Sequence, residues 1–322
     1  VDFSFFDKLE LEGLMIEDQQ KDTLLFARSA TVKINDWFFV KDKIILHYVG
    51  LEDAVVNMKR STPVWNYQFI ADYFSSPTST EKKNNNGIEF DFKEAHFKNI
   101  RFNKLDQWVG QDMIIAVQTV DATIDKADLN EGIVILNSIK LEKPYFSQSN
   151  YTGKRPDNYV APITPSSDTA NKSTKESKGF QLAVKKLTIT DGVFQNEKET
   201  VRLPYTDRFD GQHILFSDIN ASITNVSIKG SDMVADIELA AKEKSGLLVK
   251  KLKANFRFTP AIMEFNNLDL ITNKSHLKNY YSMSYESFNR DMNSFISNVV
   301  LEGNFTDSEL NSDDIAIFAP NL

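Results

Sequence analysis

The sequence predicts a mostly β fold with one or two short helices, and three observations carry this prediction. Over residues 252–258, leucine, alanine and phenylalanine alternate with lysine, asparagine and arginine, which is the period of two expected of a half-buried strand. Pro260 then ends the strand, because proline cannot donate a hydrogen bond to a β ladder, and a second strand follows in which Leu268 and Leu270 share a face. Similar short runs recur along the chain, which also has 24 phenylalanines, a residue that favours strands.

The composition limits the classes of function. With 322 residues, of which 41% are hydrophobic, the chain is long enough for one extended domain or two ordinary ones. A net charge of -8 repels phosphate backbones, so we expect no nucleic-acid partner. The absence of cysteine excludes disulfides and thiol chemistry. No apolar run approaches the roughly 20 residues that a membrane-spanning helix needs.

Residues 1–87 are expected to form a first β unit that ends in a short helix and a polar linker. Leu9 and Leu11 alternate with glutamates before Gly13, and further strand patterns follow over 23–34 and 44–58. Aromatic residues at helical spacing after Pro63 predict a short amphipathic helix within 61–74, covering one end of the sheet. An irregular aromatic plug is the alternative. Polar residues 75–87 are expected to form a loop.

Residues 88–179 are expected to form a second β unit, and residues 180–322 a third and longest one. The order of strand runs in the second unit resembles that in the first, and residues 139–142 echo residues 49–52, so we expect stacked units of one continuous sheet. The second unit is expected to end in a long loop rich in proline, serine and threonine, over 144–179. In the third unit, helical spacing occurs only around 285–295.

Histidines and acidic residues form no recognisable metal-binding pattern. None of the histidines is paired with another at metal-ligand spacing, so we expect structural roles for them: His47, His96, His213 and His276. The acidic segment around Asp313 and Asp314 lacks the loop of an EF-hand and predicts a polar turn. We therefore expect no metal and no cofactor.

Three carboxylate pairs invite comparison with glycosidases, which use two acidic side chains: Glu10/Glu12, Asp18/Asp22 and Glu197/Glu199. Such pairs are expected by chance in a chain with 45 acidic residues. We therefore expect a protein that is not an enzyme. A β-helical carbohydrate-active enzyme remains the least favoured alternative.

Four segments give the chain a resemblance to a known family. They are FDKLELEGLMIEDQQKDTLLFARSATVKIN near the start, KEKSGL at 242–247, LITNKS at 270–275 and NSDDIAIFAPNL at the end. In this order and spacing they resemble the TamB members of the AsmA-like envelope superfamily, in the long form found in the Bacteroidetes.

The resemblance implies an elongated, curved sheet, shaped like a taco or gutter, with an apolar concave face. It also implies a place in the periplasm, with an inner-membrane anchor helix and a partner barrel of the BamA (TamA-like) superfamily in the outer membrane. Phospholipid transport between the membranes, outer-membrane protein assembly, or both would be the activity. The anchor helix and the C-terminal domain of that family are missing, so we expect an N-proximal fragment that meets the barrel through parts not present here.

A lipid path needs a continuous apolar lining, and the alternating segments supply candidates for it. The residues expected to line the groove and to contact phospholipid acyl chains are Leu252, Ala254, Phe256, Phe258, Leu268 and Leu270, together with Val32, Ile34, Val117 and Ile237. The same side chains would also suit a closed, dry core. A β-sandwich that binds or adheres to a partner through its loops is the alternative function.

Overall fold

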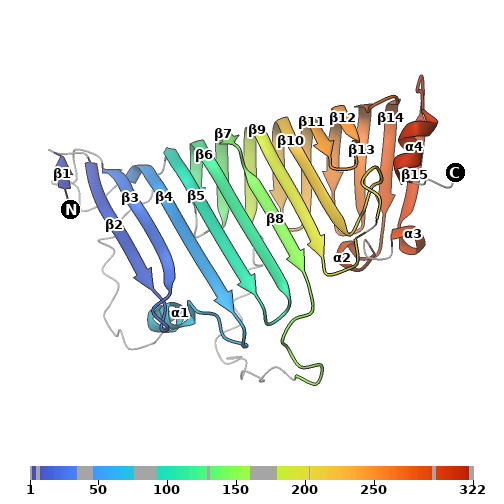
Figure 1. Cartoon of the computed structure of the whole chain (residues 1–322). Coiled ribbons are helices and arrows are strands. Elements are labelled where there is room, and N and C mark those ends of the chain that lie inside the picture. Colours follow the sequence, from blue (N-terminus) through green and yellow to red (C-terminus); the bar gives the residue numbers. More distant parts are fainter. Residues whose placement is uncertain are drawn as a thin grey trace, which may run out of the picture.

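The structure is a computed structural model, and it describes residues 2–4, 8–34, 46–75, 93–128, 131–159, 180–202, 204–291 and 295–318. These residues form one curved, 15-stranded sheet, with the N-terminus and the C-terminus at opposite ends (Figure 1). The strands lie in chain order from β1 to β15, except that β8 stands off this path and pairs with β6 and β9. At about 4.8 Å between neighbouring strands, the sheet is roughly 60 Å long. The prediction of a mostly β fold built on one large curved sheet is confirmed.

The strands are β1 Asp2–Ser4, β2 Lys8–Glu17, β3 Thr23–Ile34, β4 Leu46–Arg60, β5 Glu94–Asp106, β6 Gln111–Asp128, β7 Ile133–Glu142, β8 Tyr145–Asn150, β9 Gln181–Lys198, β10 His213–Lys229, β11 Asp232–Glu243, β12 Leu248–Phe258, β13 Ile262–Ile271, β14 His276–Ser284 and β15 Val300–Phe305. The helices are α1 Gln68–Ser75, α2 Phe288–Asp291, α3 Phe295–Asn298 and α4 Ser312–Phe318.

Most neighbouring strands are antiparallel, and the parallel pairs mark the joints between the predicted units. β4 pairs with β5 in parallel, and β9 pairs in parallel with both β7 and β8. The β4–β5 joint lies between the units 1–87 and 88–179, and the joint at β9 lies between 88–179 and 180–322. The sheet continues across both joints.

Several local predictions differ from the structure. The segment 144–179 was expected to be a loop, but it begins with β8, which is stabilised by hydrogen-bonded neighbours on both sides. α4 occupies the segment expected to be a polar turn, and its acidic first turn suits the positive end of a helix dipole. α1 begins at Gln68, later than the expected helix over 61–74, and α2 and α3 account for the helical spacing around 285–295. The predicted loop over 75–87 lies almost wholly outside the described residues, as does 160–179.

Apolar side chains line up from strand to strand on one face, which we call the inner face. Residues directly opposite each other on neighbouring strands share a face. One row of such partners crosses every strand from β2 to β14 except β8, and all its members are apolar. This long apolar row consists of Leu11, Ala30, Leu51, Phe97, Val120, Leu141, Ile189, Ala221, Leu239, Leu252, Leu270 and Leu277.

The row one residue away, on the opposite face, is polar throughout apart from one glycine. This outer polar row consists of Glu10, Thr31, Gly50, His96, Asp121, Lys140, Thr188, Ser222, Glu238, Lys253, Asp269 and Lys278. Opposite charges meet along it, as in the 3.7 Å contact between Lys253 Nζ and Glu238 Oε2. Along these two rows the sheet is therefore amphipathic from β2 to β14.

A line of residues with positive φ bends the strands of the N-terminal half. Asp53 and Asn99, with φ of 48° and 53°, lie opposite each other on β4 and β5, and asparagine and aspartate tolerate this left-handed conformation. Arg28 forms ion pairs with both Glu52 and Asp53, so these consecutive side chains lie on the same, outer face. Because the alternation shifts by one residue at this bend, the apolar residues after it return to the inner face.

The tightest packing lies in the C-terminal half of the inner face. The buried side chains of this core cluster are Val184, Val226, Ala235, Ile237, Ala254 and Leu268, from β9 to β13. Farther along the chain, Phe288 of α2 contacts Phe258 of β12, with ring centroids 5.3 Å apart. Within the described part of the chain, no helix has the length and apolar character needed to cross a bilayer.

Candidate functional site

A second row of apolar partners lies on the inner face, on the other side of the bend from the long apolar row. This phenylalanine row consists of Ile16, Leu25, Val56, Phe102, Ile115, Phe146, Phe194 and Phe216. Ile115 and Phe194 are 40% and 37% exposed. Phe146 of β8 stacks on Phe194 of β9 with ring centroids 5.7 Å apart and an interplanar angle of 4°. Aligned, exposed apolar side chains of this kind mark a binding surface.

The candidate lining residues from the sequence occupy the inner face mostly farther along the sheet. Ile237, Ala254 and Leu268 are buried in the core cluster, and Leu252, Phe256 and Leu270 pack against it. Phe258 contacts Phe288. These side chains contact other side chains in this structure, and a role in contacting lipid stays a prediction.

The remaining three candidates lie in the N-terminal half. Val32 lies between Leu9 and Val49 in a further apolar row. Val117 of β6 lies opposite Ile100 of β5. Ile34 is the last residue of β3, and its side chain lies outside the described part of the chain.

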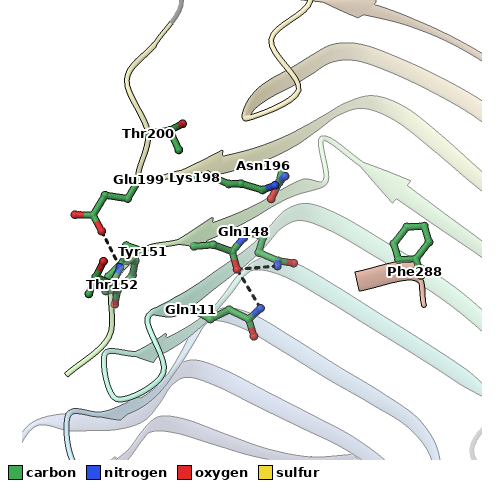
Figure 2. Close-up of a pocket in the computed structure, with 10 residues that line it drawn as sticks. Gln111, Gln148, Tyr151, Thr152, Asn196, Lys198, Glu199, Thr200 and Phe288 are labelled. Carbon is green, nitrogen blue, oxygen red and sulfur yellow. Dashed lines mark hydrogen bonds between the residues drawn. The ribbon is translucent and has the colours of Figure 1, made fainter. Parts of the chain in front are cut away.

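A pocket of about 630 Å³ opens beside the phenylalanine row (Figure 2). Its lining comes from β6, β8 and β9, from the segments that follow β8 and β9, and from α2: Gln111, Gln148, Asn150, Tyr151, Thr152, Asn196, Lys198, Glu199, Thr200 and Phe288. Because α2 follows β14, the presence of Phe288 in this lining shows that the sheet curves toward its apolar face. The pocket lies inside that curve.

The polarity of the inner face changes in steps along β8 and β9 as the strands enter the pocket. Phe146 and Phe194 form the first layer, and Gln148 and Asn196, directly opposite each other, form the next. The third layer pairs Asn150 with Lys198 and, on the other side, with Gln111 of β6. An apolar surface thus gives way to carboxamides and then to a charged rim.

Hydrogen bonds among the carboxamides hold this lining in place. Nε2 of Gln111 donates to Asn150 Oδ1 at 3.2 Å, and Nε2 of Gln148 donates to the same oxygen at 3.4 Å. The backbone N–H of Thr152 donates to Glu199 Oε2 at 2.7 Å, which ties the segment after β8 to the segment after β9. In the described part of the chain, the Asn196 carboxamide makes no hydrogen bond, and it faces the open pocket (Figure 2).

Close backbone packing holds the segment after β8, which contains Tyr151, against the turn at Gly110. Gly110, with φ of 82°, lies so near Tyr151 that an added Cβ would come within 1.9 Å of the Tyr151 carbonyl oxygen. The Tyr151 hydroxyl donates to Asp112 Oδ1 at 2.9 Å. Burial and this hydrogen bond raise the pKa of Tyr151 to about 12.

A buried histidine at the start of β10 holds the segment after β9 in place. His213 Nδ1 lies 2.7 Å from Glu197 Oε2, and His213 Nε2 lies 3.2 Å from both the hydroxyl and the carbonyl oxygen of Thr200. Glu197 also pairs with Arg202 at 2.8 Å. Burial raises the pKa of Glu197, but hydrogen bonds from Gln195 and His213 outweigh this effect and lower it below its usual range. The network holds the segment after β9 against the start of β10.

The carboxylate pairs considered for catalysis have other partners in the structure. Glu10 accepts a hydrogen bond from the Ser29 hydroxyl on the outer face, and Asp18 accepts two from the backbone of its own turn. Glu197 contacts His213 and Arg202, and Glu199 accepts a hydrogen bond from the backbone N–H of Thr152. No group of three or more metal-ligating side chains comes together among the residues that the structure describes.

The sequence reasoning missed the pocket because it treated 144–179 as a loop. A signal was present, since YFSQSN places Phe146, Gln148 and Asn150 at every second residue, as β8 then does. The matching residues of β9, Phe194, Asn196 and Lys198, show the same step from aromatic to amide to charge. In comparisons with known proteins, no family model and no curated protein matches this chain.

Proposed function

We propose that this protein carries lipid, with the acyl chains lying on the inner face of the sheet. Moving an acyl chain into water costs about 0.8 kcal/mol per methylene group, or on the order of 10 kcal/mol for a typical chain. A lipid can cross an aqueous space only along a surface that keeps its chains out of water. This task needs a continuous apolar surface and no reactive group.

The observation that carries the proposal is the unbroken long apolar row from β2 to β14, with the outer polar row one residue away. At about 4.8 Å per strand the row extends over roughly 50 Å. The acyl chains of one leaflet fill about half of the 30 Å core of a bilayer, so the row is several chain lengths long. A surface of this length fits a path along which lipid moves better than it fits a pocket for a single molecule.

The resemblance to the TamB family extends the proposal to a setting. In that setting the protein lies in the periplasm of a Gram-negative bacterium, is anchored to the inner membrane, and works with a BamA-like barrel of the outer membrane. Support of outer-membrane protein assembly belongs to the same proposal. The β-sandwich alternative is less favoured, because all the described strands belong to a single sheet.

Site-specific photocrosslinking in cells tests the proposal. A photoreactive residue in place of Phe194 should capture phospholipid, whereas one in place of Val234, an exposed apolar residue on the outer side of β11, should not. Equal lipid capture at both positions, or capture of protein alone at position 194, would refute a lipid path on the inner face.

A further inference from the structure

The step in polarity along β8 and β9 follows the same order as the polarity of a phospholipid. The phenylalanine layer matches the acyl chains, the carboxamide layer matches the ester groups of the glycerol backbone, and the charged rim matches the headgroup. Residues two apart on a strand are about 7 Å apart, so the three layers extend over roughly 14 Å. This distance is comparable with the length of the ester and headgroup region of a phospholipid.

We propose that the pocket beside the phenylalanine row binds the headgroup and ester region of a zwitterionic phospholipid. The inference rests on the proposed lipid path and names a stopping point on it. A lipid at this point would keep its chains on Phe146 and Phe194, while its polar part enters the pocket. Neither this pocket nor the one beside Trp65 is lined by a residue of the long apolar row, so we place the stopping point beside the phenylalanine row.

The carboxamides supply the hydrogen bonds that ester and phosphate groups need. Each carboxamide has two N–H donors and an oxygen acceptor. Gln111 and Gln148 each use one donor on Asn150 Oδ1, so both retain a second donor and an acceptor. The Asn196 amide faces the open pocket and is the group best placed to donate to an ester carbonyl or a phosphate oxygen.

The charges of the rim favour a zwitterion. Lys198 and Glu199, of opposite sign, both line the pocket, and the other lining residues are uncharged. A phosphate next to Lys198 and an ammonium next to Glu199 would both be matched, whereas a net anionic headgroup would leave Glu199 facing like charge. Phe288 of α2 adds an apolar ring to the lining and stands apart from the other labelled side chains (Figure 2).

The test compares three fluorescent probes with the same acyl chain: a phosphatidylethanolamine, a phosphatidylglycerol and an alkyl probe without a headgroup. The purified chain should bind the phosphatidylethanolamine about tenfold more tightly than the phosphatidylglycerol. Asn196→Leu keeps the side-chain size but removes the hydrogen bonds. It should weaken phosphatidylethanolamine binding about tenfold, as expected for one or two hydrogen bonds to a charged or ester group, and leave alkyl-probe binding unchanged.

Two further variants complete the experiment. Gln148→Leu probes the same layer from β8, and Asn266→Leu changes an exposed amide on the outer side of β13 and should bind all probes as the wild type does. Equal binding of all three probes, or no effect of either pocket variant, would overturn the headgroup site while leaving the lipid path intact. Failure of the wild type to bind even the alkyl probe would overturn both.

Discussion

Replacing Phe194 by alanine removes the most exposed aromatic ring of the phenylalanine row. Phe194 is 37% exposed, and a phenylalanine can bury about 200 Å², so roughly 75 Å² of this residue remains for contact with an acyl chain. At about 25 cal/mol per Å², that area is worth about 2 kcal/mol of binding. Phe194→Ala should therefore weaken the binding of an acyl chain by about 20-fold.

The assay is an equilibrium titration of the purified chain with a fluorescent alkyl probe, and it has a matched control. Val234 is 45% exposed but lies on the outer face, so Val234→Ala should bind the probe as the wild type does. Urea unfolding of both variants checks that binding is not lost through unfolding, since Phe194→Ala also removes the stacking on Phe146, worth about 1 kcal/mol. If Phe194→Ala binds within twofold of the wild type, or if Val234→Ala binds as weakly, the inner face is not the acyl-chain surface.

Three further predictions concern the sheet itself. Ile237→Ala should lower the free energy of unfolding by about 2 to 4 kcal/mol, because Ile237 is only 8% exposed in the core cluster; a urea midpoint equal to the wild type's would contradict this packing. Asn99→Val should lower the free energy of unfolding by about 1 to 3 kcal/mol, because valine does not tolerate the φ of 53° found at this position. Asn99→Gly should lower it less, because glycine tolerates this φ. If the same urea assay finds Asn99→Gly less stable than Asn99→Val, the positive φ is not important for stability. Burial raises the pKa of Asp314, but hydrogen bonds from Thr272 and Ser275 outweigh it, so its folded pKa is depressed. The stability that it contributes is present above the unfolded pKa and is lost as the pH falls through the folded one, so acidification below about pH 4 should destabilise the wild type more than Asp314→Ala.

The sequence by itself determined the two faces of the regularly alternating strands. Alternation of apolar and polar residues is a local property, because successive side chains of a strand point to opposite sides. The pattern therefore places Leu252 on one face and Lys253 on the other before any partner strand is known, and the end of β12 at Phe258 follows from Pro260. The echo between 49–52 and 139–142 also has a structural counterpart, since Leu51 and Leu141 both belong to the long apolar row.

Only the tertiary structure decided which apolar residues remain open and where polar groups gather beside them. The sequence favoured Ile237 and Leu268, but both are buried in the core cluster. Phe194, which lies opposite Phe146 of β8, stays 37% exposed. β8 is a strand because it finds partners on both sides, and one of these, β6, begins 34 residues before it along the chain at Gln111. The exposure of a side chain, the parallel pairing of strands and the presence of Phe288 in the same pocket lining as Asn196 all depend on how distant segments are arranged. A local pattern of residues carries no record of that arrangement.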